Sequence, residues 1–303
     1  MSKDSCNKFT APIDLTPTKN TEICDLMCEF DFNYNDSNTV VFNRGDLLSI
    51  NYDRPIKAPV LFKGTKYFVK NVMILYPSLH TFKGGHTDGE LIVIHSGEQG
   101  QNDLVICVPI VAKDAASKSA MDLEIIVDNV GSHASKVGDS VHINTLSLNL
   151  NDFVPNKPYF FYVGTFQFNN CSTKNDIIVF DYLKDAYITM TTNTYSSLTS
   201  VISPQSYKTN KKFKDFFYNK VGPIKETKNE IYIDCQPTGD NGEVIISTDK
   251  NTIDADYLSK EISKMENSKV YNALVGILLM VGLYGLGRLI FSRITSEAKP
   301  GKE

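Results

Sequence analysis

Residues 60–77 read VLFKGTKYFVKNVMILYP, and residues 84–97 read GGHTDGELIVIHSG. Each stretch contains a run of β-branched and aromatic residues bounded by Gly, Asp or Pro, which is typical of a β-strand. Runs of the same kind recur through most of the chain, with few helical patterns between them. The sequence therefore predicts a mainly β fold, built on a large, mostly antiparallel central sheet with few short helices.

Nine further runs extend this prediction to about eleven strands in all. They lie at 39–42, 47–52, 104–112, 123–127, 159–168, 176–183, 186–192, 230–235 and 243–247. No fixed repeat period relates them, which argues against a propeller or a solenoid. Helical spacing is clearest at 254–269, where Leu258, Ile262 and Met265 fall on one face. We expect this segment to form a helical stalk.

The most apolar stretch is VYNALVGILLMVGLYGLGRLIF at 270–291, whose 22 residues carry one charge, at Arg288. A helix of that length crosses the hydrocarbon core of a bilayer, and an Arg near its end reaches the interface. The opening residues are polar and lack the apolar core of a secretory signal. We therefore expect a C-terminal anchor in a lipid membrane, inserted after synthesis, with most of the chain on one side.

The predicted organisation has five parts. They are an N-terminal arm (1–10), a β domain (11–250), a helical stalk (251–269), the transmembrane anchor (270–291) and a short tail (292–303). The whole chain carries 31 Lys and Arg against 35 Asp and Glu, and the part before the anchor has a net charge of −6. Because this charge repels polyanions, we expect no nucleic-acid partner, and any binding of an acidic ligand must be local.

The sequence patterns that commonly hold metals are missing from this chain. Its six cysteines include no C-x-x-C pair, so a thiolate zinc site is not expected, and their disulfide state is left open. There is no H-x-H pair, and no phosphate-binding, dinucleotide-binding or H-E-x-x-H motif. We therefore predict no cofactor. A relocated zinc centre at His80, His86 and His95 is the least favoured alternative.

Six segments, in the same order, resemble the α-carbonic anhydrases. APIDLTP at 11–17 resembles the opening S-P-I-D/N-I of that family, and VVFNRGDLLSINYD at 40–53 resembles its L-x-N-x-G-H segment. The two stretches quoted first resemble the strands F-H-F-H-W-G and E-L-H-L-V-H-W, which hold the catalytic zinc. DLVICVPIVAK at 103–113 and FVPNKPYFFYVGTFQFNN at 153–170 resemble two later segments. The resemblance implies that the β domain has a carbonic anhydrase-like fold.

The resemblance also assigns the three zinc-ligand positions. The H-x-H pair of the family falls on Met73 and Leu75, and the third ligand falls on Ile92. A thioether is a weak ligand for Zn²⁺ and an aliphatic side chain offers no ligand atom, so these residues are not expected to hold the metal. Without a zinc-bound water, the hydration of CO₂ has no nucleophile. The resemblance thus implies a carbonic anhydrase fold that is not an enzyme.

A domain of this kind with a C-terminal anchor resembles the carbonic-anhydrase-like virion membrane proteins of poxviruses and related large DNA viruses. That resemblance implies a single-pass virion envelope protein whose N-terminal domain lies on the virion surface and binds a host glycosaminoglycan such as chondroitin sulfate. The alternative is a structural virion protein that docks on another viral or host protein through Phe216, Phe217 and Tyr218. Whether the chain forms a homo-oligomer stays open.

Two local concentrations of basic residues are candidates for binding a sulfated glycan. The N-terminal basic cluster consists of Arg54, Lys57, Lys63, Lys66 and Lys70. The C-terminal basic cluster consists of Lys208, Lys211, Lys212, Lys214 and Lys220, and aromatic residues are interleaved with it. Ammonium groups would meet sulfates while the rings stack on sugars. The opposing interpretation is a solvated lysine-rich surface whose aromatic side chains dock on the sheet.

Overall fold

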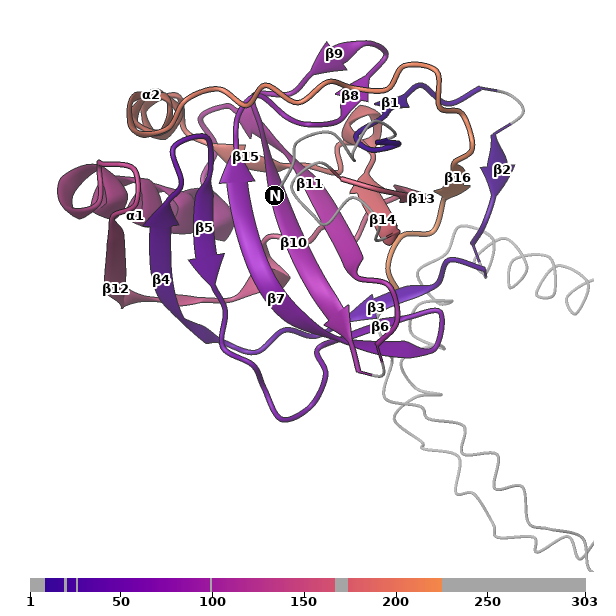
Figure 1. Cartoon of the computed structure of the whole chain (residues 1–303), viewed down its shortest axis with the longest axis horizontal. Helices are drawn as coiled ribbons and strands as arrows, with labels where there is room; N and C mark the ends of the chain where they lie inside the picture. Colours follow the sequence, from indigo (N-terminus) through magenta and orange to yellow (C-terminus); the bar gives the residue numbers. More distant parts are fainter. Residues whose placement is uncertain (1–8, 19–20, 26, 99, 167–173, 225–303) are drawn as a thin grey trace, which may run out of the picture. The chain divides into compact units, whose positions relative to one another are not determined.

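The computed structural model describes residues 9–18, 21–25, 27–98, 100–166 and 174–224, and a large sheet with two helices makes up most of this part (Figure 1). The helices are α1 (Lys118–His133) and α2 (Thr192–Val201). Two short 3₁₀ turns are η1 (Leu150–Asp152) and η2 (Tyr182–Lys184). The mainly β fold class predicted from the sequence is confirmed.

Thirteen strands of the described residues form one sheet, whose central path runs β12-β4-β5-β7-β10-β11-β14-β13-β16-β2. A separate three-stranded sheet has the order β1-β8-β9. The strands of the large sheet are β2 (Glu22–Ile23), β3 (Phe30–Phe32), β4 (Ser37–Asn43), β5 (Leu48–Asn51), β6 (Val60–Phe62), β7 (Thr65–Leu75), β10 (Gly89–Gly97), β11 (Leu104–Ala112), β12 (Ser140–Leu148), β13 (Tyr159–Gly164), β14 (Asn175–Phe180), β15 (Ile188–Met190) and β16 (Phe217–Asn219). Those of the small sheet are β1 (Asp14–Leu15), β8 (Thr81–Phe82) and β9 (Gly85–His86).

Most neighbouring strands of the large sheet run antiparallel, as the sequence predicts. The exceptions are β14 and β15, which pair with β11 in parallel, and β2, which pairs with β16 in parallel. The sheet is therefore mixed. Its centre is the long antiparallel pair of β7 and β10, in which Met73 lies opposite Ile92 and Leu75 lies opposite Glu90.

Both faces of the central strands are buried. Because alternate residues of a strand point to opposite faces, Leu91 and Val93 enter one apolar cluster, whereas Ile92 and Ile94 enter another. The first cluster contains Leu123 of α1, and we call it the helix-side core. The second, the strap-side core, consists of Ala11, Ile13, Leu15, Leu47, Met73, Leu75, Leu79, Phe82, Ile92, Ile94, Val105, Cys107, Phe160, Tyr162, Phe166, Ile177, Val179 and Phe216.

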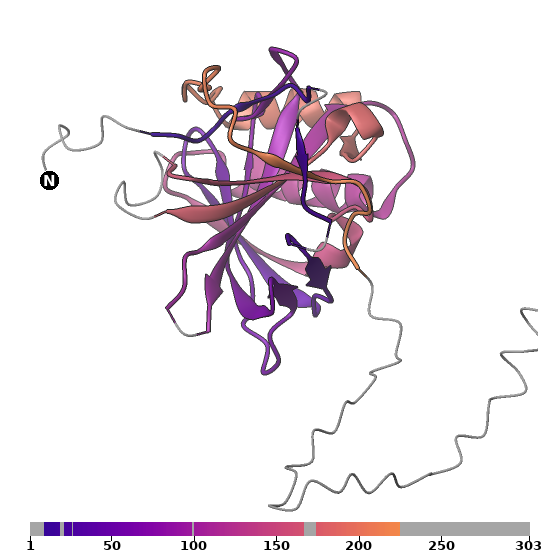
Figure 2. The ribbon, with the colours of Figure 1, turned by 90° about the vertical axis from the view of Figure 1, so that its right-hand side faces the viewer.

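A segment without regular structure, residues 203–216, covers part of the strap-side core, and we call it the strap. It runs from α2 to β16 across one end of the sheet (Figures 1 and 2). Backbone hydrogen bonds hold its start and its middle: Ser203 donates to Gly45 over 2.7 Å, Gln205 to Tyr76 over 2.8 Å, and Asn210 to Pro12 over 2.7 Å. The strap is thereby fixed next to the C-terminal end of β7.

The prediction of a strand at 123–127 is wrong, because these residues lie within α1. The run LEIIV is rich in β-branched residues, but the buried positions Leu123, Ile126, Val127 and Val130 follow the helical spacing of three and four. Ser117 caps the helix by accepting a hydrogen bond from the amide of Ala120 over 3.1 Å. The helical spacing of the apolar residues can be recognised only over the whole of α1, and not over the five residues 123–127 alone.

Two other expectations about local structure need correction. The run at 186–192 forms a strand only over Ile188–Met190, and α2 begins at Thr192, capped by the side chain of Thr191. This helix has few apolar residues, so its sequence gives a weak helical signal. The edge strand β12, SVHINTLSL, was also not predicted, because its exposed positions are polar or small and its alternation is irregular.

The structure shows whether three of the cysteines form a disulfide. Cys24 and Cys28 form a disulfide with a Cα–Cα distance of 5.4 Å, and Cys107 is a buried free thiol. The predicted strands at 230–235 and 243–247, the stalk and the anchor at 270–291 all lie outside the described residues. Among the residues that are described, no helix has the length and apolar character needed to cross a membrane.

The docking of α1 can be tested with two neighbouring isoleucines. Ile126 is fully buried in the helix-side core, whereas Ile125 is only half-buried. We expect Ile126→Ala to lower the free energy of unfolding by about 2–5 kcal/mol and Ile125→Ala by about 1 kcal/mol. Urea denaturation of both variants measures this. A strand at 123–127 would bury alternate residues, so a larger loss for Ile125→Ala than for Ile126→Ala would contradict the helix.

Candidate functional site

The three positions that the sequence assigned to zinc ligands lie together on one face of the sheet. Met73 and Leu75 are two residues apart on β7, so they share a face, and Ile92 on β10 is the cross-strand partner of Met73. All three belong to the strap-side core, with exposed fractions of 4%, 0% and 0%. The three residues share one face of the sheet, as three metal ligands would. Their side chains, however, are apolar and pack in the core.

A buried polar group lies beside these apolar residues. Glu90 of β10 is two residues before Ile92 and therefore points to the same face. His80 approaches it from the segment before β8: its Nδ1 lies 2.6 Å from Glu90 Oε1, where an Nδ1–H donates to the carboxylate. The other ring nitrogen, Nε2, lies 2.7 Å from the hydroxyl of Tyr162 on β13. The ion pair of His80 and Glu90 thus ties three parts of the chain together inside the core.

The Glu90 carboxylate is well supplied with hydrogen-bond donors. Its Oε2 accepts from the backbone amides of Leu79 (2.5 Å) and His80 (3.1 Å). Burial raises the pKa of Glu90, but the charge of His80 and these hydrogen bonds outweigh it and lower the pKa below its usual value. Burial, and then the neighbouring Glu90, raise the pKa of the Cys107 thiol well above its usual range. The carboxylate is therefore held ionised and the thiol protonated.

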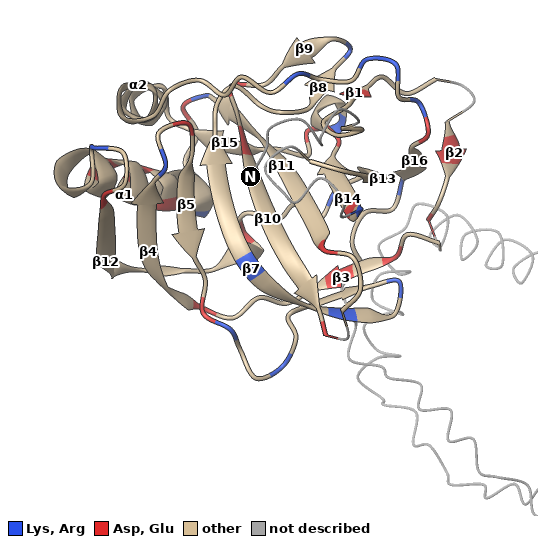
Figure 3. Cartoon of the chain, viewed as in Figure 1, with Lys and Arg blue, Asp and Glu red and all other residues tan. Residues whose placement is uncertain are grey.

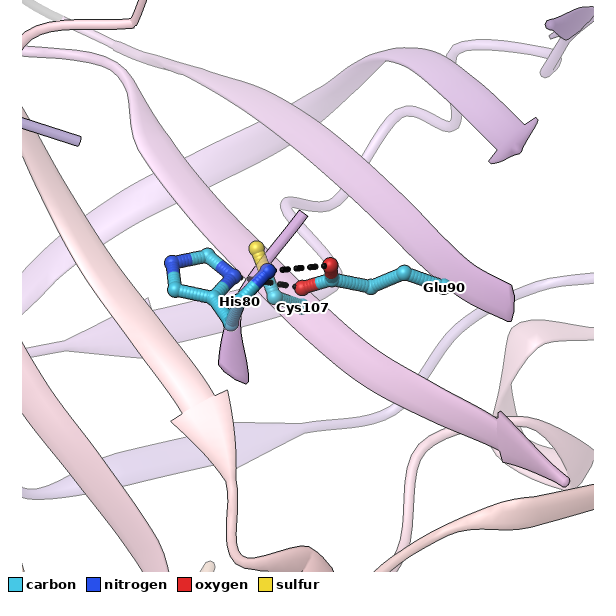
Figure 4. Close-up of side chains that lie close together, drawn as sticks. All are labelled: His80, Glu90 and Cys107. Carbon is cyan, nitrogen blue, oxygen red and sulfur yellow. Dashed lines mark hydrogen bonds and ion pairs between the residues drawn. The ribbon is translucent and has the colours of Figure 1, made fainter. Parts of the chain in front are cut away.

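His80, Glu90 and Cys107 are close enough to be considered as metal ligands, since their ligand atoms lie within 4.8 Å of one another (Figure 4). However, both ring nitrogens of His80 and both oxygens of Glu90 already have protein partners. A metal would have to break a buried ion pair to enter, which is costly. The arrangement of His80, Glu90 and Cys107 therefore suits an ion pair that holds the fold together better than it suits a metal centre.

The alternative zinc centre at His80, His86 and His95 is not supported by these positions. His95 lies on the helix side of β10, where its Nε2 accepts from the hydroxyl of Tyr34 over 3.0 Å. His86 is exposed on β9, and its Nδ1 lies 2.6 Å from the carbonyl oxygen of Ser78. Because His80 and His95 lie on opposite faces of the sheet, they cannot bind one ion.

The N-terminal basic cluster lies on exposed positions at the start of β7 and the loops before it. Several of its charges already have partners: Lys63 Nζ lies 3.9 Å from Asp176 and 3.8 Å from the centre of the Phe161 ring. Lys70 Nζ lies 3.1 Å from Asp103. Burial lowers the pKa of Lys63, while Asp176 raises it in part. Arg54 lies over the ring of Phe68, 4.1 Å from its centre. Among the described residues, neither Lys57 nor Lys66 forms an ion pair.

The C-terminal basic cluster has a different arrangement. Lys208, Lys211, Lys212 and Lys214 are all exposed along the strap, and Lys220 is exposed just after β16. The strap aromatics point the other way: Tyr207 and Phe213 pack against the strap-side core, and Phe216 belongs to it. The strap therefore presents a row of lysines outward and anchors itself with its rings.

The predicted roles of the aromatic residues need correction for this reason. Phe216 is 6% exposed and lies edge-on to Phe160, with 5.7 Å between ring centres. Phe217 and Tyr218 are half-buried and pack against the two cores. Phe216 is therefore not available to stack on a sugar or to anchor a partner protein. The interpretation in which these rings dock on the sheet is confirmed for Phe216.

Lys66 of the N-terminal basic cluster lies far from the hydrogen bond that holds the start of the strap. Lys66 is at the start of β7, whereas the strap is bonded to Tyr76, just beyond its end. Ten residues of extended strand separate the two points by about 33 Å. Figure 3 shows the same separation, with blue segments near β6 and β7 at one end of the sheet and along the strap at the other. Lys63 lies nearer to the end of the strap, because its Nζ lies over the ring of Phe161, which stacks on Phe217 with 6.2 Å between ring centres.

Comparison with known proteins bears on the fold. No family model matches the chain, and no curated protein matches its sequence. Solved structures do match. An α-carbonic anhydrase from Thermovibrio ammonificans, in complex with the inhibitor sulfanilamide, is similar with a TM-score of 0.60 and 19% identity over 71% of this chain and 88% of that one.

Two more structures give the same result. Dioscorin in complex with ascorbate matches with a TM-score of 0.58 and 17% identity, over 71% of this chain and 87% of that one. The α-carbonic anhydrase of Photobacterium profundum matches with 0.56 and 17%, over 72% and 91%. The chain has an α-carbonic anhydrase-like fold. Identities this low establish the fold alone, so the activity of the neighbours does not transfer to this carbonic anhydrase-like domain.

The sequence analysis did not predict the buried ion pair between His80 and Glu90. Glu90 and His80 are separated by ten positions, and no motif in this chain marks them as partners. The signal that could have found them is composition: a Glu inside an apolar strand such as ELIVIHS is almost never buried without a partner. The nearest histidines would then have been the candidates for that partner.

The burial of His95 makes the stability of the carbonic anhydrase-like domain depend on pH. Burial lowers its pKa to about 4, although hydrogen bonds with Leu104 and Val93 raise it in part. Because the folded-state pKa lies below the unfolded value of about 6.5, the unfolded chain binds the proton first, and stability falls as the pH falls from about 6.5 towards 4.

We therefore expect acidification through this window to remove up to about 3 kcal/mol from wild type through His95. His95→Gln should lose less over the same range, as measured by urea denaturation at pH 7.5, 6 and 5. His133→Gln, at an exposed position of α1, is the matched control and should follow wild type. An unchanged pH dependence in His95→Gln would contradict the assignment.

Proposed function

We propose that this protein is a non-enzymatic carbonic anhydrase-like protein of a virion envelope, which attaches to host cells by binding sulfated glycosaminoglycan. The observation that carries the binding part of the proposal is the row of exposed lysines on the strap, Lys208, Lys211, Lys212 and Lys214. The part of the chain before the anchor has a net negative charge, so this row is a local concentration of positive charge in an acidic chain. Each part of the proposal has separate support.

The absence of catalysis is supported by the residues at the assigned ligand positions. Met73, Leu75 and Ile92 converge as three ligands would, but they supply one soft thioether and two aliphatic side chains. The polar atoms nearby, those of His80 and Glu90, are engaged with each other. These residues do not fit Zn²⁺, and we propose that the fold has lost the metal and with it the hydration of CO₂.

Metal analysis tests this part of the proposal. We expect the purified chain, after incubation with ZnCl₂ and desalting, to retain much less than one zinc per molecule and to show no hydration of CO₂ above the uncatalysed rate. Glu90→Gln, measured in parallel, distinguishes specific binding at the buried group from weak surface binding. One zinc per chain that is lost in Glu90→Gln would support a relocated metal centre and contradict the proposal.

The glycan proposal is supported by how the strap is built. Its aromatic side chains and backbone hydrogen bonds fix it to the sheet, so its lysines project from an ordered base. The N-terminal basic cluster is the weaker candidate, because Asp176 and Asp103 neutralise Lys63 and Lys70. Exposed contacts between ammonium and sulfate are screened over about 8 Å at physiological ionic strength, so binding should be sensitive to salt.

The envelope location is supported by sequence alone. The apolar stretch 270–291 has the length of a membrane span, and a carbonic anhydrase-like domain with such an anchor resembles the virion membrane proteins of poxviruses. On this proposal the anchor holds the domain on the virion surface, and the strap faces the host cell. Host glycosaminoglycan and the lipid membrane are then the two partners that the chain requires.

The binding site can be tested by neutralising the strap. In Lys208→Gln/Lys211→Gln/Lys212→Gln/Lys214→Gln, the loss of four exposed contacts worth roughly 0.5 kcal/mol each predicts about 30-fold weaker binding to chondroitin sulfate. Elution from immobilised chondroitin sulfate by a salt gradient, with affinities by biolayer interferometry, measures this.

The matched control removes the same charge elsewhere, in Arg54→Gln/Lys57→Gln/Lys63→Gln/Lys66→Gln. It should bind nearly as wild type does. Equal losses in the two variants would mean a general attraction of charge and not a site on the strap. No retention of wild type at low salt would remove the glycan function altogether.

A further inference from the structure

A surface hollow of about 660 Å³ is lined by the turn between β8 and β9, by η2, by the end of β16 and by four residues in or near β2. These four are Pro17, Thr18, Thr21 and Ile23. Three lysines from distant parts of the sequence line it: Lys83, Lys184 and Lys220. The ring of Tyr218 and the side chain of Leu183 contribute apolar surface. The hollow therefore combines several positive charges with surfaces on which a ring can lie.

The charge of this hollow is unusual for an acidic chain. Its lining contains three lysines and one carboxylate, Asp181, which gives a net charge of +2. The other four hollows compared on the described surface have net charges of −2, −1, −1 and 0 by the same count. None of the three lysines forms an ion pair with a described carboxylate within 4 Å. The positive charge of the hollow is thus available to a ligand.

The single carboxylate is already committed to the protein. Asp181 is 2% exposed, and its oxygens accept hydrogen bonds from the hydroxyl of Tyr218 (3.0 Å) and the amide of Leu183 (3.0 Å). Burial raises its pKa, and these hydrogen bonds with the charges of Lys184 and Lys83 lower it in part. Asp181 therefore orients the wall of the hollow and is turned away from direct contact with solvent.

The backbone positions of the three lysines are well defined. Lys83 is the first central residue of the two-residue turn between β8 and β9, with φ of 52°, and Gly84 follows with φ of 80°. Lys184 ends η2 and is followed by Asp185 in the left-handed conformation. The amide of Lys220 donates to the side chain of Asp25 over 2.8 Å. Three separate elements thus present ammonium groups to one hollow.

The hollow adjoins the strap. A smaller hollow of about 350 Å³, lined by Lys214, shares Thr18 and Thr21 with the first. The two hollows therefore share part of their lining. The smaller hollow also contains Glu22 and Asp215, so the net positive charge belongs to the larger hollow, which lies next to the end of the strap.

We propose that this hollow is a subsite for an acidic saccharide unit, with Lys83, Lys184 and Lys220 binding its sulfate or carboxylate groups and Tyr218 contacting its sugar ring. The inference rests on the proposed glycan function and adds to it: the strap binds one part of a sulfated chain, and the hollow binds the next unit. A sugar ring with charged substituents suits the mixture of ammonium groups and apolar surface better than a bare inorganic anion.

The test uses the purified full chain and a chondroitin sulfate tetrasaccharide as the probe, with affinities from isothermal titration calorimetry. We expect Lys83→Gln/Lys184→Gln/Lys220→Gln to bind about tenfold more weakly than wild type. The control, Lys113→Gln/Lys136→Gln/Lys174→Gln, removes the same charge from exposed positions outside the hollow and both basic clusters, and should change the affinity less than twofold. Equal effects of the two triple variants would overturn the subsite.

A second pair of variants tests the position without removing a lysine. Leu183 lines the hollow and is 36% exposed, whereas Val163 lies on β13 outside it and is 40% exposed. Leu183→Glu should weaken binding several-fold more than Val163→Glu, because it places a negative charge within the hollow. Equal effects of these two changes would also contradict the proposal, and thermal unfolding of every variant confirms that it is folded.

Two outcomes separate this inference from the function on which it rests. Wild-type binding that is lost in the strap variant but unchanged in the hollow variant would overturn the subsite and keep the glycan function. No binding of wild type to either the tetrasaccharide or immobilised chondroitin sulfate would overturn both. Titration with sodium sulfate shows whether a free anion suffices, and binding as tight as that of the tetrasaccharide would overturn the assignment to a saccharide.

Discussion

The pairing of β7 with β10 is the constraint on which the rest of the structure depends. Where Val72–Leu75 of β7 pairs with β10, both strands are buried on both faces, so a shift of register by one residue would exchange the contents of the two cores. The pairing places Ile92 opposite Met73 and Glu90 opposite Leu75. One interaction thus fixes both the apolar cluster at the assigned ligand positions and the ion pair beside it.

The buried ion pair and the strap have complementary roles. His80 and Glu90 connect the sheet to the segment before β8, and the strap closes over the same side. A buried pair of this kind is weak evidence for stability but can favour one arrangement of a core over others. The chemistry accessible to a ligand therefore lies on the outer surface, where exposed lysines of the strap and of the neighbouring hollow gather.

Local sequence predicted some secondary-structure elements correctly and others wrongly. Long runs such as LVICVPIVA gave β11 directly, because a continuous apolar run bounded by turns suits a strand buried on both faces. The run LEIIV misled for the same reason, since over five residues a buried helix and a buried strand look alike. The lysines of the strap were found because they are contiguous. Lys220 was found with them, whereas Lys83 and Lys184 were missed because they stand apart from any basic run.

By itself, the sequence determined the fold class, the carbonic anhydrase-like order of segments and the apolar residues at 73, 75 and 92, because these depend on residue type and short-range pattern. Only the tertiary structure decided that the strap aromatics turn inward, that His80 binds Glu90, and that three lysines meet in one hollow. The physical reason is that contacts between residues far apart in the chain depend on strand register and burial, which local composition does not contain.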